Sequence, residues 1–343
     1  MPIQNINVDD SRLQELTHWF SEQLPKIAQQ AGLVETTVNH LQPSSSDASF
    51  RRYFRWSDQK KGLVLMDAPP PNEDCRPFVK VAKLLEQAGL NVPKVWAQDL
   101  ERGFLALSDL GQYTWLEILS EENADELFSL AIDALISLQK IPAETAQLPA
   151  YDEALLRREL ALFPEWYVKH ELQLEMTEQQ QYLWAQACDV LVENALRQSQ
   201  VFVHRDYMPR NLMLSEPNPG ILDFQDAVHG PISYDVISLF KDAFMSWPEE
   251  RVQRWLKQYW DKARAHGLAV PDTLDEFLYD CDLMGAQRHL KVIGIFARIN
   301  YRDGKPRYLA DTPRFFNYLQ QVIERQSALA PLAQLLASFS GEE

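Results

Sequence analysis

The sequence has few cysteines and no excess of basic residues. Its three cysteines, Cys75, Cys188 and Cys281, lie far apart and form no C-x-x-C pair, which excludes a disulfide framework and a cysteine-rich zinc site. The 343 residues include 33 Lys and Arg but 49 Asp and Glu, giving a formal net charge of -16. This charge excludes a protein that holds nucleic acid on a basic surface. We therefore expect a reducing compartment and no nucleic-acid partner.

Long hydrophobic runs are also missing. No apolar run approaches the ~18 residues that span a membrane, and the opening MPIQNINVDD has neither the basic residues nor the apolar segment of a secretory signal. The composition, 46% hydrophobic and 24% charged, is typical of a globular protein, and the length suggests about two domains. We expect a cytoplasmic monomer with no membrane partner.

The N-terminal part combines helices with strands. Apolar residues at spacings of three and four predict an amphipathic helix over 9–31, capped by Asp10 or Ser11 and ended by Gly32. A second helix is predicted over 77–88. Short apolar or alternating runs predict strands that follow a polar turn at 44–49 and that lie within 62–71, 96–100 and 103–111.

From about Asp109 onward the pattern is mainly helical, with a proline interruption near 142–149. We therefore predict an α+β fold, with a small strand-rich domain over 1–108 and a larger, mainly helical domain over 109–343.

The most informative stretch follows a short apolar strand at 201–203. That strand leads into the letters H-R-D, which end at Asp206, and Asn211 follows five positions later. Apolar arms on either side of SEPNPG predict a hairpin that returns Asp223 beside Asn211. Carboxylate and amide oxygens suit Mg2+, which keeps waters and phosphate oxygens in its shell. The stretch therefore predicts a magnesium site.

Phosphoryl transfer requires this set of groups, because a carboxylate orients the acceptor hydroxyl while an Asn and an Asp hold Mg2+ on the nucleotide phosphates. The full pattern H-x-D-x-x-x-x-N, hairpin, D-F is far more specific than H-x-D alone. Two alternatives remain. Asp206 and Asn211 are also residue types that cap local turns, and His204 with Asp206 would suit a transition metal, although no further histidine follows before His229.

This stretch is similar to the catalytic loop and metal-binding hairpin of the aminoglycoside phosphotransferase superfamily, whose members share a two-lobed protein-kinase-like fold. Matching blocks extend over most of the chain and resemble more closely the bacterial anomeric kinases of N-acetylmuramate and N-acetylglucosamine. The resemblance implies an enzyme of peptidoglycan recycling that phosphorylates the sugar at C1 with ATP and Mg2+. The blocks are SSDASFRRYFRW, MDAPPP, CRPF, LERGFL, LLRRELALFPEWY, HRDYMPRNLM, LDFQDAVHGP, DLMGAQRHLKVIGIFARI and DGKPRYL.

The resemblance also implies roles for single residues. Asp206 is the catalytic base, Asn211 and Asp223 are the Mg2+ ligands, and His204 and Asp235 support the catalytic loop. For the nucleotide, it implies a polar turn in place of a glycine-rich phosphate loop and a hinge that meets adenine. These nucleotide residues are Ser45, Ser46, Leu107, Asp109 and Leu110. Because the turn has no glycine, an ordinary polar turn is the alternative interpretation.

One expected residue is missing. Kinases carry a lysine on the third strand that pairs with the nucleotide phosphates, whereas the matching strand here offers Met66 near that position. We hypothesise that Arg51, Arg52 or Arg55 replaces it. Alternation places Arg51 and Arg55 on one face of the strand and Arg52 on the other. A solvated strand face is the alternative for each of them.

The spacing after the metal-binding Asp223 favours a small acceptor. Asp235 follows only twelve residues later, whereas a protein kinase needs a long segment there to hold a peptide. Gln225 and Asp226 directly follow Asp223, so chain connectivity holds them near the transferred phosphate. We expect at least one of them to contact the acceptor.

Further acceptor residues are expected on helices. Glu165 and Trp166 follow a proline that interrupts a helix, although Trp166 also suits a core position. On the late helix, Arg288 begins a basic stripe that lies within an arc of roughly 80°. With His289, it is expected to meet a sugar carboxylate or a phosphate, or else to pair with acids of the chain. The stripe consists of Arg288, Lys291, Arg298 and Arg302.

Other functions remain open. An aminoglycoside is a polycation and needs a cluster of carboxylates, which the acidic composition permits. A catalytically silent nucleotide-binding module is suggested by the missing lysine and opposed by the set of Asp206, Asn211 and Asp223. The residues fit either amino sugar and either ATP or GTP.

Overall fold

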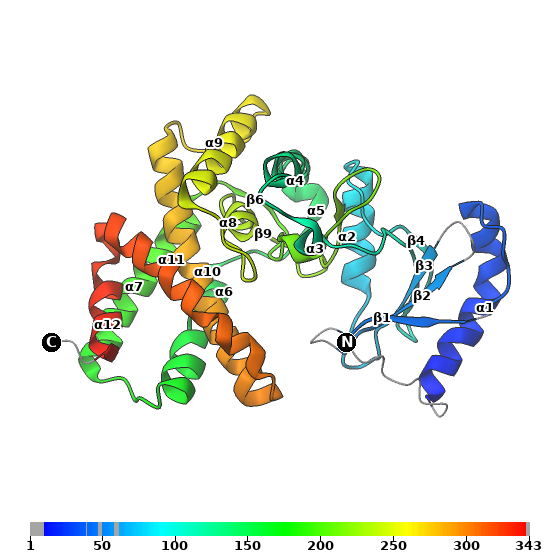
Figure 1. Cartoon of the computed structure of the whole chain (residues 1–343), viewed down its shortest axis with the longest axis horizontal. Helices are drawn as coiled ribbons and strands as arrows, with labels where there is room; N and C mark the ends of the chain where they lie inside the picture. Colours follow the sequence, from blue (N-terminus) through cyan, green and yellow to red (C-terminus); the bar gives the residue numbers. More distant parts are fainter. Residues whose placement is uncertain (1–9, 39, 47–49, 58–61, 341–343) are drawn as a thin grey trace. The chain divides into compact units, whose positions relative to one another are not determined.

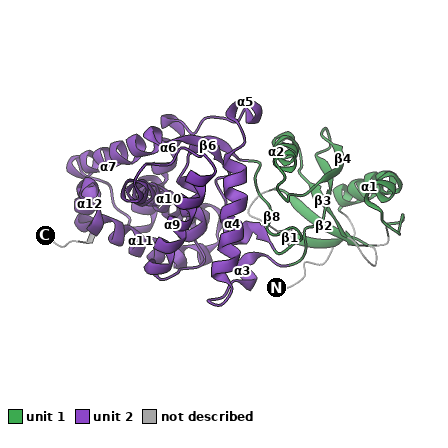
Figure 2. Ribbon diagram, turned by 90° about the horizontal axis from the view of Figure 1, so that it is seen from above, with its two compact units in different colours: residues 1–112, 214–225 green, residues 113–213, 226–343 purple. Residues whose placement is uncertain are grey.

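The computed structural model describes residues 10–38, 40–46, 50–57 and 62–340. Its contacts divide the chain into two compact units, shown in Figure 2. Unit 1 comprises residues 1–112 and 214–225, and unit 2 comprises 113–213 and 226–343. The main division lies close to the predicted boundary after residue 108, but 214–225 joins the first unit and not the second.

The contacts of Asn91 explain why 214–225 belongs to unit 1. Its side-chain Nδ2 donates to Ser215 Oγ (2.9 Å), and its backbone carbonyl accepts from the Ile221 N–H (2.8 Å). Nearby, the rings of Phe78 and Phe224 lie 4.8 Å apart. These contacts join residues that are far apart in sequence, so local patterns do not reveal them.

Unit 1 is built on an antiparallel sheet in the order β1-β2-β3-β5-β4. The strands are β1 (Gln42–Ser46), β2 (Arg52–Ser57), β3 (Gly62–Asp67), β4 (Val95–Asp99) and β5 (Phe104–Ser108), with a short β8 (Gly220–Ile221) in the later segment. The helices are α1 (Ser11–Ala31) and α2 (Arg76–Gln87). The predicted strands and both predicted helices are therefore present, but β1 was not predicted, and its residues 44–46 lie in a strand where a polar turn was expected.

Helix α1 covers one face of this sheet (Figure 1). Its N-terminus is capped by Asp10, whose carboxylate accepts from the Leu13 N–H (3.0 Å), and it ends at Gly32 with φ +67°. Apolar side chains from α1 and from alternate positions of the strands form the core, because successive strand residues face opposite sides. These include Leu16, Phe20, Leu24, Phe54, Leu65 and Phe104.

Unit 2 is mainly helical, as predicted. Its α-helices are α3 (Trp115–Ile118), α4 (Ala124–Gln139), α5 (Ala143–Ala146), α6 (Glu153–Leu160), α7 (Glu178–Arg197), α8 (Tyr234–Phe240), α9 (Glu249–Ala265), α10 (Leu274–Asp303), α11 (Thr312–Arg325) and α12 (Ala330–Ser340). Shorter elements are η1 (Phe163–Glu171), η2 (Pro209–Asn211), η3 (Pro306–Asp311), η4 (Ser327–Leu329) and strands β6 (Gln200–Val203), β7 (Leu212–Met213) and β9 (Val228–Pro231). Strand β6 pairs with β9 in antiparallel fashion.

Helix α10 lies at the centre of unit 2 and packs against α7, α8, α9 and α11 (Figure 2). It packs closely on the backbone that precedes η1. A Cβ atom on Gly294 would lie 2.4 Å from the Leu162 carbonyl carbon, so only glycine fits there. The η1 segment is a π-helix that starts beside Pro164, which agrees with the predicted interruption because proline removes a helix donor.

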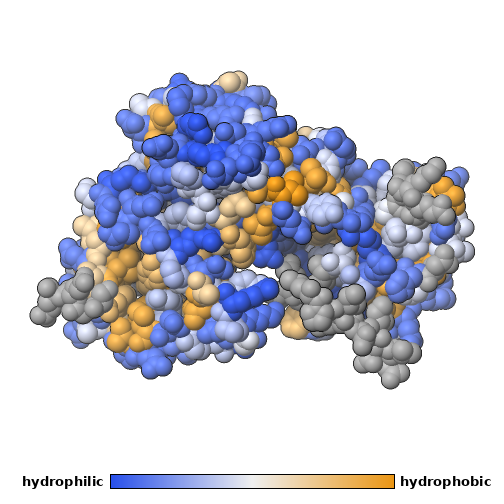
Figure 3. Space-filling model, in the orientation of Figure 1, coloured by the Kyte–Doolittle hydropathy of each residue, from blue (hydrophilic) through white to orange (hydrophobic). Residues whose placement is uncertain are grey.

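The face of the molecule seen in Figure 3 is mostly hydrophilic, with smaller hydrophobic areas between. Among the described residues, the structure has no helix whose length and apolar character would let it cross a membrane.

Candidate active site

The loop that follows β6 is held by one buried carboxylate, that of Asp235 in the first turn of α8. Asp235 Oδ2 accepts from the His204 N–H (2.6 Å), and its Oδ1 accepts from the Arg205 N–H (3.0 Å). Arg205 has φ +77°, a strained conformation for a residue with a side chain. The two bonds therefore fix the backbone immediately before Asp206.

The environment of Asp235 opposes its ionisation. Complete burial raises the pKa of Asp235 to about 7, although the two backbone N–H groups and the nearby Arg288 guanidinium favour the charged form. A carboxyl group with this pKa changes its protonation state close to neutral pH, and the ionised form is the stronger acceptor for the two N–H groups.

Asp206 is half-buried at the tip of this loop. Its backbone carbonyl accepts from Asn211 Nδ2 (2.9 Å) and from the Met208 N–H (3.0 Å). The hydroxyl of the buried Tyr207 donates to the Ala131 carbonyl (2.8 Å), which anchors the loop on α4. Because the Asn211 nitrogen is the donor, its carbonyl oxygen is the side-chain atom that is suited to a cation.

Asp223, in the part of unit 1 that follows β8, has φ +62° and accepts from Gln225 Nε2 through Oδ1 (2.8 Å). Gln225 is buried and Asp226 is exposed. The described residues contain no group of three or more His, Cys, Asp or Glu side chains that could hold a metal ion. The oxygens of Asn211 and Asp223 nevertheless fit Mg2+, which completes its shell with phosphate and water. Since the two residues belong to different units, the motif spacing carries the prediction that they share one ion.

The three arginines near the predicted phosphate loop have different partners in unit 1. Arg52 Nη2 lies 2.6 Å from Asp67 Oδ2, and its guanidinium also pairs with Asp10 at the start of α1. Arg51 Nη2 lies 3.0 Å from Glu73 Oε2. Arg52 is therefore bound on the α1 side of the sheet, as the predicted alternation requires.

Arg55 lies on the sheet face opposite α1. It stands directly across from Val64, which in turn stands across from Leu107 in the predicted hinge. Arg55 Nε lies 2.6 Å from Asp109 Oδ2, and Nη2 donates to the Gly111 carbonyl (2.7 Å). Arg55 therefore lies at the hinge segment.

The other nucleotide candidates are only partly described. Ser45 and Ser46 end β1, while residues 47–49 of the predicted phosphate loop lie outside the described residues. Leu107 is buried in β5, and Leu110 is half-buried. Around the hinge, a cavity of about 390 Å³ is lined by Leu33, Leu63, Trp96, Ser108 and Asp109.

The acceptor candidates of η1 lie at the surface of unit 2. Glu165 is exposed, and the half-buried Trp166 stacks on His170 with ring centroids 5.1 Å apart. Trp166 is thus not the core residue that the alternative interpretation suggested.

Two residues of the predicted basic stripe of α10, Arg288 and Lys291, are buried in unit 2, whereas Arg298 is half-buried and Arg302 is exposed. The side chain of Arg288 is only 2% exposed, and that of His289 is 0% exposed, stacked on Tyr318. Burial lowers the pKa of His289 well below its ordinary value. Both residues are therefore packed inside unit 2, and their contact with a sugar or a phosphate stays a prediction. Arg302 pairs with an acid of the chain, as the alternative interpretation suggested: its Nε lies 2.7 Å from Asp303 Oδ1.

A buried cluster around Glu159 was not predicted from the sequence. The Glu159 carboxylate pairs with Arg205 of the catalytic loop and with Lys291 Nζ (2.9 Å), and it accepts from the Tyr151 hydroxyl. Lys291 Nζ also donates to the Tyr234 hydroxyl (2.9 Å). Burial raises the pKa of Glu159, but the two cations outweigh this and hold the pKa below its ordinary value.

The amino-acid sequence is similar to those of known phosphotransferases. Residues 40–277 match the model of a family described as phosphotransferase enzymes. Over 331 residues, covering 96% of this chain and 98% of the relative, the sequence is 59% identical to the N-acetylmuramate/N-acetylglucosamine kinase of Pseudomonas aeruginosa. The protein of the same name from Neisseria meningitidis serogroup B is 48% identical over 306 residues, covering 88% of this chain and 90% of the relative.

Solved structures share the fold at low sequence identity. The ethanolamine kinase of Plasmodium vivax matches with a TM-score of 0.61 and 10% identity, covering 92% of this chain and 91% of that one. A complex of APH(2")-IIa with streptomycin and ATP matches with a TM-score of 0.59 and 15% identity, covering 94% and 99%. The predicted kinase-like α+β fold is therefore confirmed.

Proposed function

Since the chain belongs to the phosphotransferase enzyme family, we propose that it is a kinase that uses ATP and Mg2+ to phosphorylate N-acetylmuramate and N-acetylglucosamine. The observation that carries the proposal is the near full-length identity to relatives named for both sugars. The acceptor atom is the anomeric C1 hydroxyl, and the reaction serves peptidoglycan recycling, as the sequence resemblance implies.

In this mechanism the carboxylate of Asp206 accepts a hydrogen bond from the sugar hydroxyl and takes its proton as the phosphoryl group transfers. The anomeric hydroxyl is more acidic than other sugar hydroxyls, so Asp206 need not be a strong base. Positioning supplies much of the rate in a loose phosphoryl-transfer transition state. The hydrogen bonds that the His204 and Arg205 N–H groups donate to the Asp235 carboxylate provide that positioning.

The Asn211 carbonyl oxygen and the Asp223 carboxylate would hold Mg2+, which when bound neutralises charge on the nucleotide phosphates. The bond from Asn211 Nδ2 to the Asp206 carbonyl supports this role, because it fixes which amide atom is available. Gln225, bonded to Asp223, remains our candidate for a contact with the acceptor, together with Asp226, Glu165 and Trp166.

Phosphorus NMR of the purified protein with Mg-ATP and each sugar tests the proposal. We expect a new anomeric phosphate signal with both sugars. Asp206→Ala and Asp223→Ala should each reduce turnover by orders of magnitude, while Asp189→Ala, at an exposed ion pair on α7, should leave it unchanged. No signal with either sugar, together with phosphorylation of an aminoglycoside, would replace the proposal with antibiotic phosphotransferase activity.

A further inference from the structure

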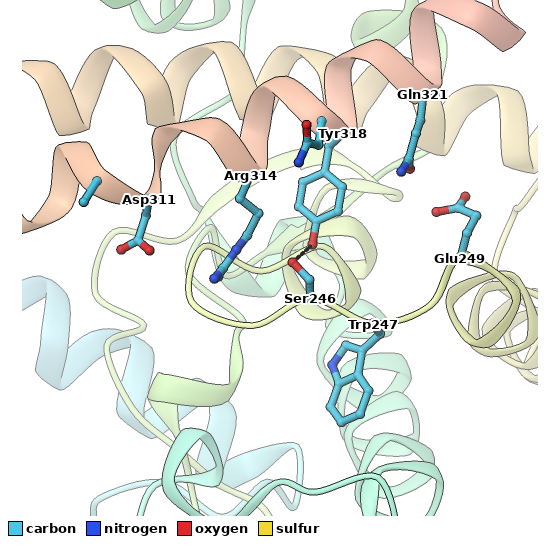
Figure 4. Close-up of a pocket in the computed structure, with 9 residues that line it drawn as sticks. Ser246, Trp247, Glu249, Asp311, Arg314, Tyr318 and Gln321 are labelled. Atoms are coloured by element: carbon cyan, nitrogen blue, oxygen red, sulfur yellow. Dashed lines mark hydrogen bonds between the residues drawn. The ribbon is translucent and has the colours of Figure 1, made fainter.

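Unit 2 contains a polar cavity that no sequence motif indicates. It lies between α11 and the segment 246–249 that leads into α9, and its volume is about 420 Å³ (Figure 4). This volume falls within the range of small-molecule sites, roughly 300–1,000 Å³. Its polar lining includes Ser246, Glu249, Asp311, Arg314, Asn317 and Gln321.

Three of the polar groups in the cavity wall already have partners within the chain. The Tyr318 hydroxyl bonds to Ser246 Oγ (2.8 Å), which joins α11 to the segment opposite (Figure 4). The Glu249 carboxylate lies 3.3 Å from Lys241 Nζ and 3.3 Å from Arg325 Nη1. Its negative charge is therefore balanced by two neighbouring cations, and the remaining charged side chains of the lining are Arg314 and Asp311.

Arg314 supplies a cation with donors to spare. Its side chain extends from α11 toward the opposite segment (Figure 4), where Nη1 donates to the Ala243 carbonyl (2.9 Å). A guanidinium has five N–H donors, and this bond is the one that Arg314 makes within the described residues. The bond fixes the guanidinium at the cavity wall and leaves the other donors for a ligand.

Two carboxamides extend the same wall. Asn317 and Gln321 follow Arg314 by three and seven positions, which places the three side chains on one face of α11. In the part of the chain that the structure describes, neither carboxamide forms a hydrogen bond. Each carries donors and an acceptor that suit hydroxyl and acetamido groups.

The cavity wall is connected to the catalytic loop within unit 2. Ala243, which Arg314 holds, is followed by Phe244, whose ring centroid lies 5.0 Å from the guanidinium carbon of Arg210. Arg210 lies in the same loop as Asp206. The segment that forms the wall therefore also contacts the loop that carries the catalytic base.

On the basis of the proposed function, we propose that this cavity binds the lactyl group of N-acetylmuramate and that Arg314 binds its carboxylate. A guanidinium recognises a carboxylate through two parallel N–H bonds. N-acetylglucosamine lacks the lactyl group and makes no such contact. Arg314 thus takes the role that was predicted for Arg288, which is buried in unit 2.

The test compares the two sugars in one variant, Arg314→Gln. We expect kcat/KM for N-acetylmuramate to fall roughly 10- to 150-fold, as for a lost hydrogen bond to a charged group, and kcat/KM for N-acetylglucosamine to change less than about threefold. Arg314→Lys keeps the charge but not the paired donors, and should lie between the two. Arg254→Gln removes an exposed cation of α9 and should change neither value.

Activity on N-acetylglucosamine shows that the variant is folded. An equal loss for both sugars, or no loss for either, would overturn the role of Arg314 while the proposed function stands. A wild-type protein that phosphorylates neither sugar would instead remove the proposed function itself.

Discussion

Asp235→Asn should separate the positioning of the catalytic loop from its stability. The carboxylate accepts hydrogen bonds from two backbone N–H groups, at 2.6 and 3.0 Å. An amide has only one oxygen, so the Asn side chain would turn its NH2 group toward the second N–H donor. Losing a bond to a charged acceptor costs about 1.5–3 kcal/mol, and it releases the strained Arg205, which directly precedes Asp206. Since a displacement of ~1 Å can cost ~100-fold in rate, we expect kcat to fall about 100-fold.

The pKa of Asp235 makes this effect depend on pH. Burial raises the pKa to about 7, so lowering the pH through 7 protonates the carboxyl and removes one of its acceptor positions. The kcat of the wild-type protein should therefore decline on the acid side of pH 7. The amide of the Asn variant does not titrate. The kcat of the variant should therefore be low at every pH and should fall less than that of the wild type as the pH drops below 7.

Stability should respond in the opposite direction. An unfolded Asp ionises near 3.8 and the folded Asp235 near 7, so between these values rising pH favours the unfolded chain. At about 1.4 kcal/mol for each pH unit, the ionised carboxylate costs the folded state about 4 kcal/mol above pH 7. The difference in the free energy of unfolding between Asp235→Asn and the wild type should therefore shift in favour of the variant by up to about 4 kcal/mol as the pH rises from 4 to 8.

Steady-state kinetics and urea unfolding at pH 5 and pH 8 measure both effects. Asp280→Asn is the matched control, because burial also raises the pKa of Asp280 to about 6, but its partner is Arg197 on α7. Activity of Asp235→Asn within about threefold of wild type at pH 8, or an equal loss of activity in Asp280→Asn, would refute the reasoning.

Two further predictions use matched pairs. Gly294→Ala should lower the free energy of unfolding by about 1–3 kcal/mol, because its Cβ would meet backbone atoms of Leu162. On the same helix, a Cβ atom on Gly285 would have its nearest contact at 3.5 Å, so Gly285→Ala should raise the free energy of unfolding by about 0.5–1 kcal/mol in the same urea titration. Equal effects of the two substitutions would contradict the close packing of Gly294 on Leu162. Arg51→Ala should weaken ATP binding in calorimetry, whereas Arg52→Ala, bound to Asp67, should mainly lower the melting temperature; unchanged ATP affinity in Arg51→Ala would exclude it as the replacement for the missing lysine.

Local features of this protein could be predicted because they depend on neighbouring residues. The cap at Asp10 and the stop at Gly32 bound α1 as expected, since capping and left-handed backbone are properties of short segments. Apolar spacing likewise predicted α2 and the strands β2 to β5, but it did not predict β1. The H-R-D loop was identifiable because its chemistry depends on residues within a few positions of one another.

The remaining features depend on contacts between distant residues. Periodicity placed Arg288 on a basic face of α10, but it could not show that other helices surround that face and bury the side chain. The partners of Glu159 come from α10 and the catalytic loop, and Asn91 draws residues 214–225 into unit 1. No sequence motif pointed to Arg314, because the cavity wall forms only when α11 and the segment after Lys241 come together in the fold.

The contacts along α10 also restrict insertions and deletions. Its residues reach three different neighbours in turn: Arg288 lies near Asp235, Lys291 pairs with Glu159, and Gly294 touches the backbone at Leu162. Deleting one residue between Lys291 and Gly294 would rotate the rest of the helix by about 100°. The number of residues between Lys291 and Gly294 is therefore constrained to two. Homologous chains that vary in length should do so in the loops at either end of this helix.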